Sequence, residues 1–230
     1  MDDGKTGYDP SPVNKLPAIV VVVFLGMLAV EGALALAEAG MIGGAAGLGW
    51  RSDLIAQYGV SPEIFAWMKT TGQWPAENLL RFVTYSFLHY GFVQMAIGGA
   101  IFLAMGKLVG EVIGAWAAGV IFFVSAAFGA LVYAWAQVGN AWLIGAFPGA
   151  YGLIGGFTFV LWARARMTGQ NQAQAFSLIA MLMGIQLLFG LIFGTDNTWV
   201  SELAGFVSGF ALCFVFVPGA RAALLARLRR

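Results

Sequence analysis

The first apolar run of the chain reads LPAIVVVVFLGMLAVEGALALA, from Leu16 to Ala37. A run of this length can cross the hydrocarbon core of a bilayer, which is about 30 Å thick and takes about 20 residues of helix. Its single charged residue is Glu31, a carboxylate that is costly in lipid unless it is paired or hydrated. A mixed-charge segment precedes the run and no clear cleavage site follows it, so we expect a retained transmembrane helix and not a signal peptide.

Five further apolar segments follow, at residues 92–110, 111–137, 149–165, 174–193 and 198–217. Hydrophobic residues make up 60% of the chain and charged residues 10%, whereas a soluble domain has about 25% charged residues. The sequence therefore predicts an all-α membrane protein with six transmembrane helices. The fourth and sixth segments carry spaced glycines that allow close helix contact, so we expect both at the centre of the bundle. These helix-packing glycines are Gly149, Gly152, Gly156, Gly205 and Gly209.

The region between the first and second segments, residues 38–88, differs in character because charged residues and tryptophans appear among glycines. Ser52, Ser61 followed by proline, and Pro75 are typical of helix starts. We therefore expect short helices that lie in the membrane interface, where tryptophan side chains are favoured. The tryptophans of this region are Trp50, Trp67 and Trp74.

Basic residues separate between the two sides of a six-helix arrangement. Nine of the twelve fall on the side of the two termini: Lys5, Lys15, Lys107, Arg164, Arg166, Arg221, Arg227, Arg229 and Arg230. The other three are Arg51, Lys69 and Arg81. The positive-inside rule then places both termini in the cytoplasm, and the lack of an organellar presequence suits a bacterial inner membrane. The predicted divisions are a flexible tail at 1–15, a membrane domain at 16–217 with residues 38–88 as its outer loop, and a basic tail at 218–230.

Composition argues against several classes of function. A net charge of +1 provides no strong field for nucleic acid. His89 and Cys213 are the only histidine and cysteine, so we expect no metal, no cofactor and no intrachain disulfide. Apolar neighbours surround Cys213, which favours a small buried side chain over a reactive thiol.

Four segments then occur in an order that resembles a known family. They are RFVTYSFLH at residues 81–89, a pair of glycines at 106 and 114 with Glu111 between them, GAYGLIGG at 149–156 and ELAGFVSG at 202–209. Together they resemble the rhomboid family of intramembrane serine proteases from about Leu80 to Gly209. The resemblance implies a rhomboid-like bundle of six helices. It also implies a serine nucleophile on the fourth helix and a histidine base on the sixth.

The residues at the positions implied by the resemblance differ from those of a protease. Tyr151 stands in place of the serine and Glu202 in place of the histidine, while Gln94 and Gly98 replace the histidine and asparagine of the oxyanion site; His89 is retained. Proteolysis requires an alcohol whose proton a neighbouring base takes. The leading interpretation is therefore a catalytically inactive rhomboid-like protein. We expect it to bind transmembrane segments of partner proteins, as an accessory or assembly subunit.

Alternatives remain open at this stage. A divergent protease would use another hydroxyl, with His89 or Glu202 as its base; the candidate serines are Ser86, Ser125, Ser201 and Ser208. Glu202 could instead contact a client helix, respond to protons, touch water, or accept a hydrogen bond from Tyr151 that joins the fourth and sixth helices. For Glu31 and Glu38 we expect contacts with other helices or with the interface, and for His89 a structural role.

Overall fold

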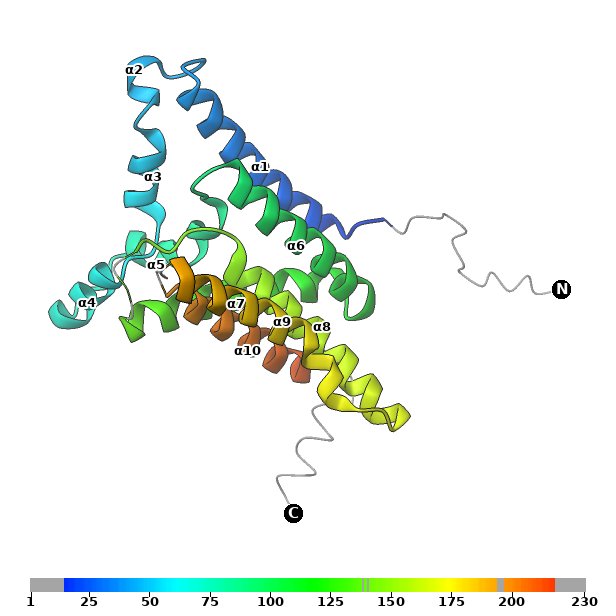
Figure 1. Ribbon diagram of the computed structural model, residues 1–230. Helices are drawn as coiled ribbons and strands as arrows, with labels where there is room; N and C mark the ends of the chain where they lie inside the picture. The colour runs from blue at the N-terminus through cyan, green and yellow to red at the C-terminus, as the bar shows by residue number, and fades with distance from the viewer. Residues whose placement is uncertain (1–14, 138, 140, 194–196, 218–230) are drawn as a thin grey trace.

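The computed structural model describes residues 15–137, 139, 141–193 and 197–217, and its long helices follow the predicted apolar segments to within a few residues (Figure 1). Six long helices occur in the described part: α1 Ala18–Glu38, α6 Phe92–Val112, α7 Ala115–Ala136, α8 Phe147–Thr168, α9 Ser177–Phe193 and α10 Trp199–Phe216. The predicted all-α bundle is thus confirmed. Apart from residue 15, the predicted tails at 1–15 and 218–230 lie outside the described residues.

One predicted boundary is wrong. Glu111 does not open the third segment, because α6 continues to Val112. The chain turns at Gly114, whose φ of 125° is open to glycine but rarely to other residues. The third long helix, α7, therefore starts only at Ala115.

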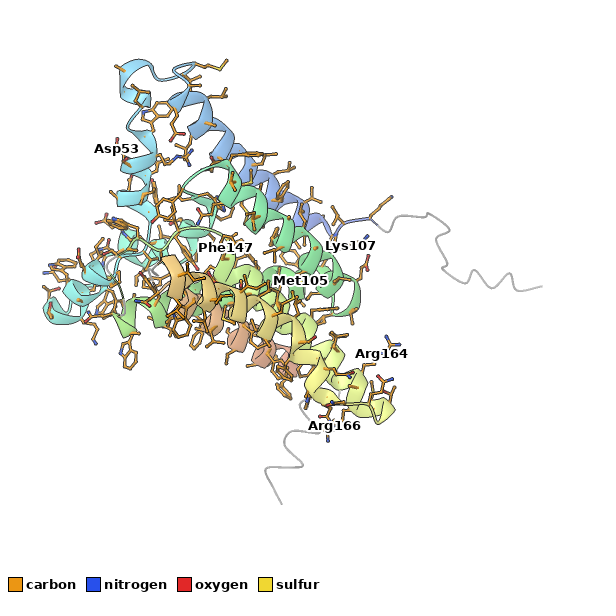
Figure 2. All side chains as sticks on the ribbon, viewed as in Figure 1. Asp53, Met105, Lys107, Phe147, Arg164 and Arg166 are labelled. Carbon is orange, nitrogen blue, oxygen red and sulfur yellow. The ribbon has the colours of Figure 1, made fainter. Side chains whose placement is uncertain are left out.

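The long helices run back and forth between two ends of the bundle (Figure 1). The short helices α2 Gly44–Gly47, α3 Trp50–Tyr58, α4 Pro62–Thr71 and α5 Ala76–Thr84 and the 3-10 turn η1 Tyr85–Phe87 gather at one end, which we name the loop end. Figure 2 shows Lys107, Arg164 and Arg166 at the opposite end, which we name the basic end. The described chain begins and finishes at the basic end (Figure 1).

Helix α8 differs from the other long helices in composition. By length and apolar character, five segments are able to cross a membrane: α1, α6, α7, the combined η2–α9 segment Gln172–Ile192, and α10. Glycines lower the apolar content of α8, and Arg164 and Arg166 lie in its last two turns. Every residue from Pro148 to Gly156 is nevertheless buried. The residues of α8 therefore contact other helices, and need not be apolar enough for lipid.

The short helices at the loop end begin at local capping signals. Ser61 precedes α4, and its hydroxyl oxygen accepts a hydrogen bond of 3.2 Å from the backbone N–H of Glu63, as the sequence predicts. Pro75 directly precedes α5. The prediction at Ser52 is wrong, because α3 begins two residues earlier, after Gly49, and Ser52 lies in its first turn.

Backbone hydrogen bonds at the loop end fix the position where α8 begins. Val60 and Leu143 exchange two N–H to carbonyl bonds of 2.9 and 3.1 Å. The N–H of Gly145 donates to the carbonyl of Tyr85, whose hydroxyl in turn donates to the carbonyl of Ala126 on α7. Gly145 has a φ of 106°, so this turn favours glycine. These bonds connect the entry to α8 with α7 and the short helices.

Candidate functional site

The contact between α8 and α10 brings the two backbones together without side chains between them. A Cβ atom added to Gly205 would meet the carbonyl oxygen of Pro148, and one added to Gly209 would meet the carbonyl oxygen of Gly152. Both obstacles are backbone atoms, which cannot rotate away as a side chain can. The spacing of the two glycines on α10 therefore brings that helix directly against the first turns of α8.

The glycines of α8 face more than one neighbour. A Cβ on Gly149 would lie 2.6 Å from the ring of Phe122 on α7, and one on Gly152 would meet the side chain of Ser125. Gly156 differs from these two. The nearest atom to a Cβ there is the sulfur of Cys213, at 3.4 Å, which is an ordinary contact. A methyl group therefore fits at Gly156 and not at Gly149 or Gly152.

Tyr151 of α8 and Glu202 of α10 lie together at this contact. The Tyr151 hydroxyl lies near the Glu202 carboxylate, and the negative charge of the carboxylate acts on it. Both side chains are buried, with exposed fractions of 5% and 6%. Glu202 also lies in the first turn of α10, where the helix dipole favours negative charge.

An apolar cluster surrounds the Tyr151 side chain. Its buried members are Tyr151, Ile154, Ile179 and Phe206, from α8, α9 and α10. Partly buried residues of α6 and α9 pack against it, among them Ile101, Met105 and Leu182. Figure 2 shows Met105 and Phe147 in the region between the α6 and α9 ribbons. Tyr151 therefore contributes to the packing of α6, α9 and α10 on α8.

Gln94 and Gly98 both lie near the start of α8. The side-chain oxygen of Gln94 accepts a hydrogen bond of 2.7 Å from the N–H of Tyr90, and its amide nitrogen points to Gly145. A Cβ on Gly98 would lie 3.6 Å from the ring of Phe147. Gln94 thus keeps a donor group close to the entry of α8, whereas an apolar ring lies beside Gly98.

His89 belongs to a charged cluster at the loop end that sequence reasoning missed. Arg51 of α3 donates to the carboxylate of Glu31 at 2.9 and 3.0 Å, to the carboxylate of Glu38 at 2.6 and 3.1 Å, and to the carbonyl oxygen of His89 at 2.6 Å. Glu31 is 2% exposed and Arg51 11%. A single carboxylate in the first apolar run and an arginine in the next loop were the available signals.

Burial determines the charge states in this cluster. The buried His89 ring is poorly solvated as a cation, which lowers its pKa to about 4 and keeps it neutral at neutral pH. The Glu38 and Glu31 carboxylates raise the pKa of Arg51 further above its ordinary value, so its charge is permanent. A neutral imidazole beside a permanently charged ion pair fits a structural role for His89.

The candidate serines differ in their burial and in their hydrogen bonds. Ser201 donates to the backbone carbonyl of Thr198 at 2.6 Å. Ser86 and Ser125 are fully buried, and Ser208 is half-buried on α10. In the described part of the chain, no hydrogen bond joins any of these hydroxyls to the His89 ring or to the Glu202 carboxylate. No group of three or more His, Cys, Asp or Glu side chains within the described residues could hold a metal ion.

Comparison with known families agrees with this architecture. Residues 76–219 match the family model of the Rhomboid domain, a match that covers more than half of the chain. The chain belongs to the rhomboid family. The matched region runs from α5 to the end of α10, so it contains both Tyr151 and Glu202. A comparison with curated proteins gave no match.

Rhomboid membership agrees with the long apolar helices. The family match and the apolar helices show that the chain is a multi-pass protein embedded in the membrane, with its outward-facing side chains in contact with lipid. Large apolar side chains are exposed on several of its long helices, among them Val22 of α1, Trp116 of α7 and Leu191 of α9. In a bilayer such side chains lie in a favourable environment.

Proposed function

We propose that this chain is a catalytically inactive rhomboid that binds transmembrane segments of partner proteins, as an accessory or assembly subunit. One observation supports the proposed loss of catalytic activity. At the two positions where the family resemblance implies a serine and a histidine, Tyr151 and Glu202 are both buried and lie near each other, with the Tyr151 ring in a packed apolar cluster. Tyr151 and Glu202 link α8 to α10 and occupy the positions that the resemblance assigns to a nucleophile and its base.

The chemistry of the pair supports the loss of proteolysis. A phenol oxygen lies beyond the ring, well away from where a serine oxygen would stand on the same helix turn, so an acyl group bound to it would be displaced. A serine protease also needs an imidazole that takes the proton of the alcohol and returns it to the leaving amine. The Glu202 carboxylate lies near the phenol of Tyr151 and has no serine hydroxyl there to activate.

Helix α9 supports the binding part of the proposal. Among the five segments apolar and long enough to cross a membrane, the one that contains α9 has the smallest buried share. Its contacts with the bundle run through the Tyr151 cluster, at Ile179 and Leu182. Leu178 and Met183 also pack against this cluster, whereas many of the remaining described apolar side chains are exposed, including Met181, Ile185, Leu188, Leu191 and Ile192. A partner helix would find a broad apolar surface here without disrupting the α8–α10 contact.

The orientation that we propose follows from the charges. The basic end carries Lys107, Arg164 and Arg166, and the described chain begins and finishes there. Positive residues favour the cytoplasmic side of a membrane, so both termini would lie in the cytoplasm, and a bacterial inner membrane suits this arrangement. A cysteine-accessibility assay on a Lys107→Cys variant in intact cells would test it. Labelling by an impermeant reagent added outside would contradict the proposed orientation.

Site-directed photo-crosslinking in the native membrane tests the binding proposal. A photoreactive amino acid replaces Ile185 or Leu188 on α9, and the matched control replaces Trp116, which is 80% exposed on α7. We expect both α9 positions to crosslink the same protein, with the crosslink mapped to a transmembrane segment of that partner, and the α7 position to crosslink lipid alone. Equal crosslinking from α7, or none from α9, would contradict the proposal.

A further inference from the structure

The basic end of the bundle contains an apolar cavity of about 540 Å³. It lies where α6, α8 and α10 finish, and its apolar lining includes Ile113 directly after α6, Phe159 and Ala163 of α8 and Phe216 of α10. Its volume falls within the range of about 300–1,000 Å³ that is typical of small-ligand sites. An apolar chain is the kind of group that such a lining takes.

A positively charged side chain, that of Arg164, lies at the edge of this cavity. Arg164 lines the cavity and also lines a second one of about 250 Å³, where Gln170, Asn171 and Gln174 provide side-chain amides. Arg164 is exposed, so its guanidinium reaches the interface between the apolar cavity and the polar one. Arg164 therefore lies between the apolar cavity, which suits an apolar chain, and the polar cavity, which is lined by hydrogen-bond donors.

The net charge around the two cavities is positive. Lys107 of α6 lies 3.9 Å from Glu111, so these two residues offset each other. Among the described residues, none that lines either cavity is acidic. Arg166 adds a second cation one helical turn from Trp162, with its guanidinium 5.8 Å from the centre of the Trp162 ring. The surroundings therefore favour an anion next to the apolar space.

We propose that this place is a binding site for an anionic phospholipid. One acyl chain occupies the apolar cavity, and the phosphate lies against Arg164 with the amides of Gln170 and Gln174 as further donors. Basic sites between transmembrane helices are suited to anionic headgroups, because the phosphate gains both charge and hydrogen bonds there. The site is separate from Tyr151 and Glu202, so this inference is independent of the proposed function.

Native mass spectrometry of the delipidated full chain tests the site. Dioleoylphosphatidylglycerol, dioleoylphosphatidylcholine and inorganic phosphate are added in separate series, and the fraction of protein with one bound molecule is measured. We expect phosphatidylglycerol to bind more tightly than phosphatidylcholine, and phosphate alone to bind weakly. Equal binding of the two lipids, or phosphate that competes as well as the lipid does, would overturn the proposal.

Three variants locate the binding. Arg164→Gln should weaken phosphatidylglycerol binding about fivefold, the effect of one basic residue near an anionic headgroup. Arg166→Gln removes the same charge from the same helix but lines neither cavity, so it should have a much smaller effect. Ala163→Trp should block the apolar cavity and leave the charge unchanged. Equal losses in the two arginine variants, or full binding in a folded Ala163→Trp variant, would overturn the site.

Discussion

The loop end of α1 and α3 and the contact between α8 and α10 are held together by different interactions. At the loop end, Arg51 connects two helices and the His89 carbonyl through charged hydrogen bonds. Between α8 and α10 the backbones touch through Gly205 and Gly209, with little side chain between them. The Arg51 cluster depends on charge and protonation, and the two glycine contacts depend on volume.

This difference shows where the fold has room for variation. A buried ion pair is sensitive to loss of one partner, because an uncompensated charge then remains in a poorly solvated place. A glycine contact is insensitive to charge and has no space for a single methyl group. Variants in each region should therefore respond to different conditions.

The largest effect is expected for Arg51→Met. It leaves Glu31 buried without its guanidinium, and loss of one partner of a buried ion pair costs about 3–5 kcal/mol. Unfolding in detergent is measured with a thiol-reactive dye, since Cys213 is the only cysteine and is fully buried. The matched control, Arg51→Met with Glu31→Gln, should regain much of the stability. A melting temperature equal to that of the wild type would show that the ion pair contributes nothing.

The next effect is expected for Gly209→Ala, which forces a methyl group against the carbonyl of Gly152. Overpacking of this kind costs about 1–3 kcal/mol. Gly156→Ala is the control, since it makes the same chemical change inside a helix where the nearest atom is 3.4 Å away. We expect the control to melt at or slightly above the wild-type temperature. If both variants lost the same stability, close backbone contact would not explain the role of Gly209.

The loop end should also respond to pH. Because the pKa of His89 falls from about 6.5 in the unfolded chain to about 4 in the folded one, the unfolded state binds more protons between these values. Stability is therefore fully present above about pH 6.5 and is lost as the pH falls toward 4. The loss should be roughly 1 kcal/mol between pH 7 and about 5.5. Tryptophan fluorescence during thermal unfolding measures it.

The same scan on His89→Gln provides the comparison for the pH effect. His89 is the only histidine in the chain, so this variant should show a flatter dependence across that window. An unchanged dependence would assign the effect to another group. The Gly209→Ala variant should keep the wild-type slope, because the α8–α10 contact has no histidine.

The smallest effect is expected for Tyr151→Phe, which removes the hydroxyl next to Glu202 and keeps the ring in its apolar cluster. Removal of a buried hydroxyl that interacts with a carboxylate costs about 1 kcal/mol. Tyr58→Phe on α3 is the control, since it makes the same change at a half-buried side chain away from α8. Equal melting temperatures for Tyr151→Phe and the wild type would mean that the hydroxyl does not join α8 to α10.

The sequence predicted the helices well because lipid imposes both a length and a composition on each of them. The glycine spacing on α10 led to the expectation of close helix contact, and Gly205 and Gly209 do approach the backbone of α8 closely. The pairing of Arg51 with Glu31 could not be predicted, because 20 residues and a reversal of the chain separate them. Helix starts were predictable only where a cap was local, as at Ser61, whereas α3 begins after Gly49, which has no side chain to act as a signal.

The candidate site was predictable in its residues and not in its surroundings. The positions of Tyr151 and Glu202 follow from the order of the family motifs. Their contact depends on how closely α10 approaches α8, which the carbonyl groups of Pro148 and Gly152 determine. The cluster that α6 and α9 form around Tyr151 involves residues such as Ile101 and Leu182, which carry no local signal.

The central claim is that Tyr151 and Glu202 leave this rhomboid without a nucleophile and a base. The most direct measurement incubates the protein in vesicles with a serine-reactive fluorophosphonate and a generic transmembrane substrate, with an active rhomboid protease in parallel as the positive control. We expect no labelled serine and no cleaved substrate where the control shows both. A labelled serine together with cleaved substrate would contradict it.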